Sequence, residues 1–449
     1  MQNIKSIFRN LEVQKYFFNT SWLMGDKVIS IGLLMLTSII VARHLGPEGY
    51  GLLSYSVSLA TLFAIATNMG LHGLAIRELV RFPDKHARML GAIFWLKATG
   101  AIVALCAFFL LIFFTETIGD TPFFILLIVS GIILFKPFEV IDFWFQAKVM
   151  AKYPALSRVI AALFFATSSV LLASFGAGTT SFAFTYLLQA AALAVLLIFF
   201  YSRKSPVPLK SWTFRFSDAT VLLGQSWMIM LGALFAMIYL KIDQVMIRWM
   251  VSVEEVGVYS VAVQLSESWY FIPAMLVASI FPKLIELRQS NALLFEKRLQ
   301  QLFDLLFVIS LILAAVITLF AGPLVKLLYG SGFEKAALFL TIHIWAAIFI
   351  FMRAAFSKWI LIENVIAFST LTQGLGALLN VVLNFVLIPH YGGTGAAIAT
   401  LISYATASYF SLIFFSKTRP VFKMMTLALL SPFRYIYVMF RPTTQDSSP

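Results

Sequence analysis

The sequence predicts an all-α polytopic membrane protein, with about twelve transmembrane helices in two pseudo-symmetric six-helix lobes around a central cavity. Three observations predict this class: an apolar composition, basic loops that recur on one side, and an internal repeat. Of the 449 residues, 61% are hydrophobic and 12% are charged, whereas soluble domains carry about 25% charged residues. Because no polar stretch exceeds the roughly twenty residues of one membrane helix, no room remains for a soluble domain.

Twelve apolar runs are long enough to cross a bilayer, which takes about twenty helical residues. The spans that we predict are 17–42, 51–70, 91–114, 122–138, 155–175, 180–201, 219–241, 256–280, 302–321, 336–353, 364–388 and 394–415. We expect all twelve to be helices.

The basic residues indicate the orientation of these spans. Most of the 33 Lys and Arg residues fall in segments that precede odd spans or follow even ones, and the opposite loop at 116–120 is acidic. Short loops rich in Lys and Arg stay in the cytoplasm, which places both termini there. Twelve spans also require both termini on one side. The net charge of +13 therefore reflects membrane orientation, and nucleic acid is not an expected partner.

An internal repeat divides the chain. Each half holds six spans and so inserts in the same sense, which predicts a parallel repeat of the kind seen in two-lobed carriers. The matched pairs are Ser21-Trp22 with Ser226-Trp227, Glu48 and Gly51 with Glu254 and Gly257, Trp144 with Trp359, and Gly178-Thr179 with Gly393-Thr394.

We predict four parts: a first lobe over 1–201, a basic cytoplasmic linker over 202–217, a second lobe over 218–415, and a cytoplasmic amphipathic tail over 416–449. Residues 421–440 are long enough for a thirteenth span. Lys423, Arg434 and the central Pro432 instead favour an amphipathic segment on the membrane surface.

Several charged residues lie inside the predicted spans, where each costs at least about 2.5 kcal/mol unless it faces water or a partner. The residues that we single out are Asp26, Lys27, Lys97, Arg158, Lys241, Asp243, Glu267, Arg353 and Lys358. Asp26, Lys27 and Glu267 are too deep to reach the surface and are expected to face a cavity, or else to form ion pairs that only fix packing. Lys241, Asp243 and Arg353 lie near predicted helix ends, where snorkelling is an alternative.

No pattern in the sequence predicts an enzyme. The five histidines do not have the spacing of metal ligands, and no Gly-Lys loop that would cradle a phosphate is present. We therefore expect no metal, no cofactor and no built-in ATPase. The single cysteine, Cys106, cannot form an intramolecular disulfide.

Five motifs carry a family resemblance that covers nearly the whole chain, to about residue 415. They are residues 42–51 (ARHLGPEGYG), 77–78 (RE), 144–147 (WFQA), 242–243 (ID) and 256–260 (VGVYS). On these motifs the chain resembles polysaccharide-transport flippases of the multidrug/oligosaccharidyl-lipid/polysaccharide exporter superfamily, most of all the bacterial O-antigen flippases.

The resemblance implies translocation of a polyprenyl-diphosphate-linked oligosaccharide, such as an O-antigen repeat unit, to the outer leaflet of the bacterial inner membrane. The implied mechanism is alternating access coupled to H⁺ or Na⁺, with a polysaccharide polymerase and chain-length proteins as candidate partners. Lys27, Lys97, Arg158, Arg353 and Lys358 would favour the anionic headgroup. Asp26, Asp243 and Glu267 would couple transport to the ion. The alternatives are a cation-coupled multidrug antiporter, which needs a net acidic cavity, and a membrane polysaccharide polymerase, which typically has a large outer loop.

Overall fold

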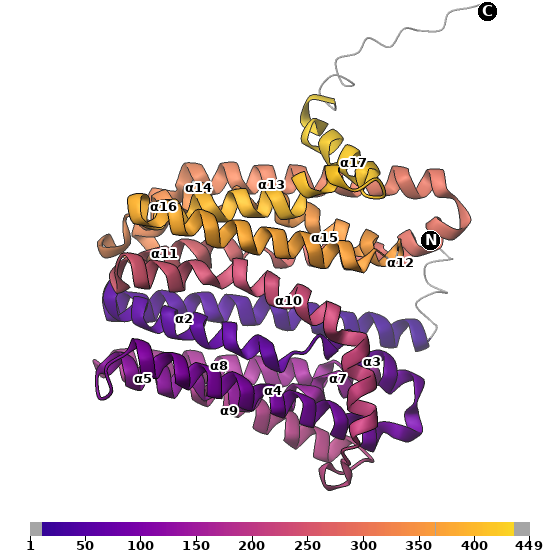
Figure 1. Cartoon of the computed structure of the whole chain (residues 1–449), viewed down its shortest axis with the longest axis horizontal. Helices are drawn as coiled ribbons and strands as arrows, with labels where there is room; N and C mark the ends of the chain where they lie inside the picture. Colours follow the sequence, from indigo (N-terminus) through magenta and orange to yellow (C-terminus); the bar gives the residue numbers. More distant parts are fainter. Residues whose placement is uncertain (1–10, 364, 435–449) are drawn as a thin grey trace, which may run out of the picture.

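The computed structural model describes residues 11–363 and 365–434. Within these ranges the chain consists of helices joined by short turns, without a β-strand, so the all-α prediction is confirmed. Helices α2 to α9 lie together in the lower half of Figure 1 and α11 to α17 in the upper half, and α10 runs from one group to the other. Helix α10 joins the two groups, because it contacts α3 and α4 as well as α16.

The bounds of the helices follow the predicted spans closely. The first half contains α2 (Leu11–Ala64), α3 (Leu71–Arg81), α4 (His86–Thr115), α5 (Thr121–Ser130), α6 (Ile132–Phe135), α7 (Val140–Ala147), α8 (Lys152–Ser174) and α9 (Thr179–Lys204), with 3₁₀ turns η1 (Ile65–Thr67) and η3 (Lys136–Glu139). The second half contains α10 (Phe216–Met250), α11 (Val253–Glu267), α12 (Phe271–Ser290), α13 (Ala292–Tyr329), α14 (Ala336–His343), α15 (Ala346–Ile362), α16 (Ile366–Ser408) and α17 (Arg419–Leu429), with the 3₁₀ turn η6 (Phe410–Phe414).

The number of crossings agrees with the predicted twelve. Ten helical segments of the described chain are long and apolar enough to cross a bilayer, and the two longest have 64 and 48 residues. Each of these two is too long for one crossing of about twenty residues. Helix α2 turns sharply at Gly46 (φ 69°, ψ −179°) and α16 at Gly392 (φ 54°, ψ −135°). Because positive φ values favour glycine, these residues form two hairpins, each of which supplies two crossings.

Four spans are interrupted rather than continuous. In the first half, span two breaks between α2 and α3 at η1, and span four breaks between α5 and α7 at Gly131 and η3. In the second half, span eight breaks between α11 and α12, and span ten between α14 and α15. The breaks thus recur at corresponding spans of the repeat. Interrupted helices at matching positions in two halves are a feature of transporter binding sites.

The two halves approach most closely at a reciprocal pair of glycines. A Cβ atom added to Gly51 would overlap the Val253 carbonyl group, and one added to Gly257 would overlap the Pro47 carbonyl group. In the repeat Gly51 corresponds to Gly257, and Pro47 corresponds to Val253 by the same offset. The Arg43 guanidinium also donates to the Leu327 carbonyl oxygen (2.6 Å) at this end of the molecule, which the charge rule places outside the cell.

We expect Gly51→Ala to separate the two halves at this end. The added methyl group has no space beside the Val253 backbone, and overpacking of this kind costs about 1–3 kcal/mol. Spin labels placed across the contact should therefore report a longer distance. Gly224→Ala is the matched control, because the space around Gly224 is open and alanine favours a helix. Unchanged distances in Gly51→Ala would contradict this account of the contact.

Two sequence predictions change in detail. The span predicted over 219–241 ended at Lys241, but α10 continues to Met250, so Lys241 and Asp243 lie inside the helix and not near its end. In the tail, the described part of 421–440 contains most of α17, an 11-residue helix that is too short to cross a bilayer, and a further helical stretch at residues 431–434. Helix α17 packs on α13 and η6 through Val421, Met425 and Ala428, and residues 435–440 lie outside the described ranges.

Candidate functional site

A chamber lies between the two halves. It consists of three adjoining cavities of about 320, 350 and 410 Å³. The first and second share Ile31, Leu34 and Tyr186, and the second and third share Ile132 and Lys136. The first half supplies most of the walls, and α10 and α11 close the chamber from the second half. These volumes are in the range of small-molecule sites, and adjoining cavities can hold a larger polar group.

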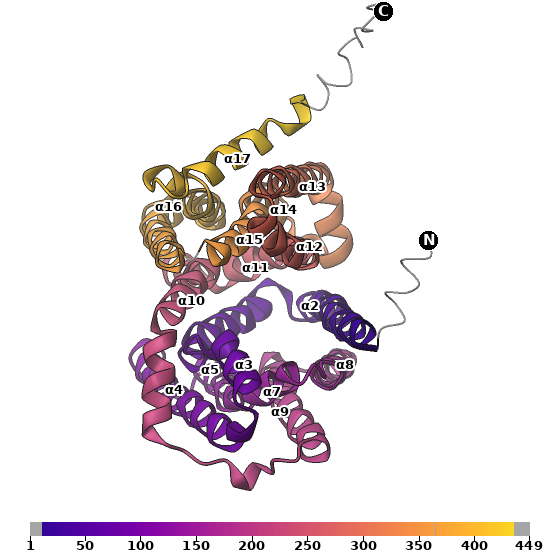
Figure 2. The ribbon, with the colours of Figure 1, turned by 90° about the vertical axis from the view of Figure 1, so that its right-hand side faces the viewer.

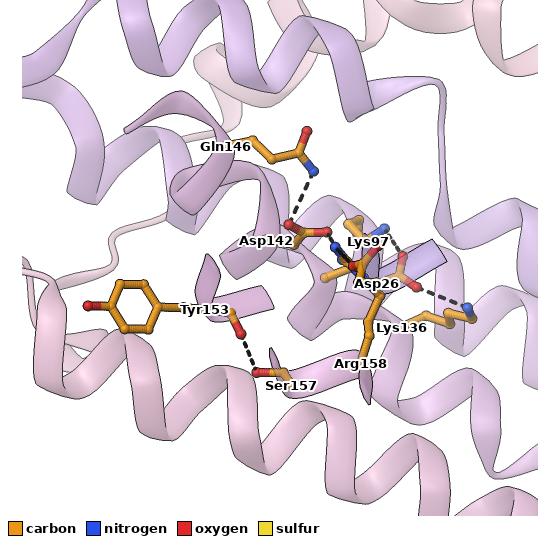
Figure 3. Close-up of polar contacts among 9 residues, drawn as sticks. Asp26, Lys97, Lys136, Asp142, Gln146, Tyr153, Ser157 and Arg158 are labelled. Carbon is orange, nitrogen blue, oxygen red and sulfur yellow. Dashed lines mark hydrogen bonds and ion pairs between the residues drawn. The ribbon is translucent and has the colours of Figure 1, made fainter. Parts of the chain in front are cut away.

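The break in span four places a charged pair in the chamber wall. Pro137 cannot donate a backbone hydrogen bond, so the helix tightens into η3, and Lys136 and Glu139 line the chamber there. The Lys136 ammonium lies 2.9 Å from one Glu139 carboxylate oxygen, and the Lys97 ammonium lies 3.2 Å from the other. Lys97 is fully buried and lies over the Phe143 ring at 5.4 Å. Figure 3 shows Lys97 and Lys136 approaching this point from different helices.

Arg158 ties three helices of the first half together. Its guanidinium donates to Asp26 of α2 (2.6 Å from Nε) and to Asp142 of α7 (2.8 Å from Nη1). Asp142 also accepts from Gln146 (3.1 Å), as Figure 3 shows. Asp26 is 4% exposed, whereas Arg158 is partly exposed and lines the second cavity. These contacts place the Arg158 guanidinium in the chamber wall, with the carboxylates of Asp26 and Asp142 behind it.

We expect Glu139→Gln to lower the free energy of unfolding by about 3–5 kcal/mol, because it leaves the buried Lys97 ammonium without its carboxylate. Adding Lys97→Met should restore most of this loss. Lys136→Gln is the control and should cost no more than about 1 kcal/mol, since Lys136 is 37% exposed. Chemical denaturation in detergent measures all three. Equal losses for Glu139→Gln and Lys136→Gln would show that the Lys97 pair is unimportant for stability.

The second half contributes one ion pair to the chamber. Lys241 of α10 and Glu267, the last residue of α11, lie 3.2 Å apart, and both line the first cavity. Next to them, the Ser58 hydroxyl donates to the Gln244 side chain across the two halves. Lys241 therefore faces the chamber, and it does not snorkel to a membrane surface.

Asp243 lies behind this wall in a buried polar network. Its carboxylate is 3% exposed and accepts hydrogen bonds from Tyr259 (2.8 Å), Asn384 (2.6 Å) and the Thr400 hydroxyl. The donors come from α11 and from both limbs of α16. Asn380 adjoins Asn384 (3.2 Å), and within the described residues its side-chain nitrogen and the Asn384 side-chain oxygen have no hydrogen-bond partner. Buried polar atoms without a partner are unusual and indicate a further ligand or a function.

The structure brings together only part of the predicted site. Asp26, Lys97 and Arg158 lie in one cluster, and Glu267 lies in the chamber wall. Lys27 is exposed on α2 and does not line the three cavities. Arg353 and Lys358 are half-buried and also lie outside these cavities: Arg353 donates to the Ala407 carbonyl oxygen (2.8 Å), and Lys358 lies over the Phe281 ring at 5.1 Å.

Three charged residues of the site, Lys136, Glu139 and Asp142, carry no prediction from the sequence. Lys241 is predicted only near a helix end, whereas in the structure it lies in the chamber wall. A signal was present: Lys136, Glu139 and Asp142 recur at intervals of three residues in an apolar run that contains Pro137. Such spacing places charges on one face of a helix.

The fold is that of polytopic membrane transporters. The lipid II flippase MurJ in an inward closed conformation matches with a TM-score of 0.66 and 15% identity, over 94% of this chain and 93% of MurJ. An inward-facing multidrug resistance MATE family transporter of the MOP superfamily matches with a TM-score of 0.60 and 13% identity, over 91% and 96%. At these identities the matches establish the architecture alone.

The family follows from the sequence comparison. Residues 17–288 match the model of the polysaccharide biosynthesis protein family, and the chain belongs to that family. A curated relative, the "Probable flippase AglR" of Haloferax volcanii, is 25% identical over 175 residues. That match covers 38% of this chain and 37% of AglR.

Proposed function

We propose that this protein is a flippase that moves a polyprenyl-diphosphate-linked oligosaccharide from the cytoplasmic to the outer leaflet of a bacterial inner membrane. An O-antigen or similar surface polysaccharide repeat unit is the proposed cargo. The observation that carries the proposal is the chamber between the halves, whose described charged lining comprises Lys136, Arg158 and Lys241 against Glu139 and Glu267. The family, and the names of MurJ and AglR as flippases, support the same class of activity.

The lining suits an anionic headgroup. A diphosphate is too costly to move through about 30 Å of hydrocarbon without compensating charge. The Arg158 guanidinium can bind a phosphate through two parallel hydrogen bonds, and Lys136 lines the same cavity. In the structure each of these cations is held by a carboxylate. A diphosphate would bind Arg158 and Lys136 from the cavity while Asp26 and Asp142 remain behind the guanidinium as its partners, and the polyprenyl tail stays in the lipid.

The closed glycine contact supports a direction of loading. It brings the two halves together at the end that the charge rule predicts to lie outside the cell, which favours uptake of cargo from the cytoplasmic side. Opening that end and closing the other by rocking of the halves gives alternating access, as in other two-lobed carriers. The cytoplasmic location of both termini is part of this proposal.

The Asp243 network is the proposed coupling site. It offers one carboxylate together with side-chain oxygens of Asn380, Asn384 and Thr400, all buried. Oxygen donors suit hard cations, and a single carboxylate is neutralised by one positive charge. The arrangement therefore fits Na⁺ or H⁺ better than a divalent ion. Glu267 and Asp26 differ from Asp243 in being paired with cations, which makes them weaker candidates for this role.

Two alternatives are less well supported. A multidrug antiporter for cations needs an acidic chamber, but the described lining has three cations and two carboxylates. A membrane polymerase would need room for glycan chemistry outside the membrane. On the predicted outer side, α10 and α11 are joined by Val251 and Ser252 alone, and α13 and α14 by residues 330–335.

Genetic complementation tests the proposed function. The full chain is expressed in a strain that lacks its own O-antigen flippase and is matched in repeat-unit structure. Restored surface polysaccharide is the expected result. If the protein is inserted in the membrane at normal levels in several such strains and none regains polysaccharide, while resistance to cationic drugs rises, the antiporter alternative replaces this proposal.

A further inference from the structure

A further cavity, separate from the three that form the chamber, lies in the hairpin formed by α12 and α13. It has a volume of about 490 Å³ and is referred to below as the hairpin groove. The residues that line it are Ser279, Ile280, Lys283, Leu284 and Leu287 of α12, and Leu294, Arg298, Gln301, Leu302 and Leu305 of α13. Their spacing of three and four residues places each set on one face of its helix. The groove thus has apolar walls and one cation on each side.

The two cations lie at the level of the lipid headgroups. The predicted spans end at residue 280 on α12 and begin at residue 302 on α13, so Lys283 and Arg298 each lie about one helical turn outside the hydrocarbon. Helix α13 has 38 residues, or about 57 Å at 1.5 Å per residue, and extends well beyond the hydrocarbon core of about 30 Å. The turn between α12 and α13 lies at the same end of the molecule as the start of α2 (Figure 1).

The apolar part of the groove continues onto the lipid-facing surface. Leu284 and Leu302 form a buried floor, whereas Leu305 is 44% exposed. Ile312, Val316 and Leu319 of α13 follow Leu305 at helical spacing and are all exposed. An acyl chain could therefore extend from the groove along α13 within the hydrocarbon.

Both cations are available to bind an anion. Within the described residues Lys283 pairs with Glu286, and both side chains are more than 60% exposed, so the pair contributes little. The Arg298 guanidinium donates to the neutral Gln301 side chain (2.9 Å). Lys297 adds a further exposed cation, and the acidic residues on this part of α13 are the exposed Glu296 and the buried Asp304, which pairs with Arg434. Basic pockets between membrane helices on the cytoplasmic side are suited to anionic headgroups.

We propose that the hairpin groove binds an anionic glycerophospholipid of the cytoplasmic leaflet. Its phosphate lies between Lys283 and Arg298, and one acyl chain lies against Leu305. The site is separate from the chamber and does not depend on the proposed transport function. It would hold α12, which follows the break in span eight, against α13.

Native mass spectrometry of the purified full chain tests the site with dioleoyl phosphatidylglycerol and dioleoyl phosphatidylcholine as probes. We expect Lys283→Gln with Arg298→Gln to weaken phosphatidylglycerol binding about tenfold, because each cation near an anionic headgroup contributes to the free energy of binding. Lys210→Gln with Arg215→Gln makes the same change of charge at exposed positions outside the groove and should change binding less than twofold. Equal weakening in both variants, no weakening in either, or equal affinity of the wild type for both lipids would overturn the proposal.

A second variant tests the acyl-chain part. Leu305→Trp should fill the groove and weaken both lipids about equally, whereas Leu319→Trp, at a 75% exposed position of the same helix, should not. If Leu305→Trp binds both lipids as well as Leu319→Trp does, the groove does not hold an acyl chain and the proposal fails in that part.

Discussion

Arg158→Gln is expected to abolish transport and to destabilise the protein, and a second substitution should separate these two effects. The change leaves the buried Asp26 carboxylate without its guanidinium. We expect the free energy of unfolding to fall by about 3 kcal/mol, the lower end for a broken buried pair, because Arg158 is 31% exposed. Adding Asp26→Asn removes the more buried of the two carboxylates that lose this partner, and Asp142 keeps its hydrogen bond from Gln146. Stability should therefore recover in the double variant, but transport should not.

The transport loss has its own physical reason. Loss of one partner from a desolvated charge pair with the diphosphate costs about 3 kcal/mol or more, a factor above 100. Surface polysaccharide in the complemented strain and denaturation in detergent measure the two effects. Arg88→Gln is the matched control, because the Arg88 guanidinium forms a similar bidentate pair with Asp218 (2.7 and 3.0 Å) outside the chamber. Normal polysaccharide from a well-inserted Arg158→Gln/Asp26→Asn variant would show that Arg158 serves only to fix packing.

Asp243→Asn is expected to remove a cation-dependent gain in stability without unfolding the protein. A ligand at 100 times its dissociation constant stabilises by about 2.7 kcal/mol. If Na⁺ is the coupling ion, the wild type should melt higher in NaCl than in choline chloride at equal ionic strength. The variant keeps the shape of the side chain but loses the charge, so it should melt at the same temperature in both salts.

The comparison among ions and variants makes this test specific. If the proton is the coupling ion, Na⁺ and choline should give the same melting temperature in the wild type. Uptake of cargo by the wild type should instead depend on a pH gradient, and uptake by Asp243→Asn should not depend on it. Glu267→Gln is the control, because its partner is Lys241 (3.2 Å) and it lies outside the Asp243 network. An Asp243→Asn variant that keeps the full response to Na⁺ or to pH would exclude Asp243 as the coupling residue.

The fold could be predicted from the sequence because the membrane restricts the choices. A bilayer requires backbone hydrogen bonds to be satisfied within helices, so apolar length alone specified twelve crossings. Gly46 and Gly392 mark the hairpins through their need for positive φ. Pro273 predicts a kink in span eight, but the interruptions of spans two, four and ten were not predicted, because contacts between helices stabilise them and the local composition stays apolar.

The site was predicted only in part, because depth in a span does not specify direction. Asp26 and Lys27 are adjacent in sequence, yet a helix turns about 100° per residue. The result is that Asp26 is buried against Arg158 whereas Lys27 is exposed. Lys97 was expected to contact the cargo, but in the structure it is fully buried under Glu139. Its proposed role is therefore to position Glu139. The partners Glu139 and Asp142 could be identified only once α4, η3, α7 and α8 were placed in space.

The central claim is that the chamber carries the headgroup of a lipid-linked oligosaccharide. Proteoliposomes that contain the purified full chain and a fluorescent polyprenyl-diphosphate-linked oligosaccharide test it most directly, with a membrane-impermeant reagent to report which leaflet holds the sugar. We predict rapid exchange between leaflets with the wild type, and with the Arg158→Gln/Asp26→Asn variant a rate no higher than in protein-free liposomes. Exchange at the wild-type rate by that folded variant, or none by the wild type, would contradict the claim.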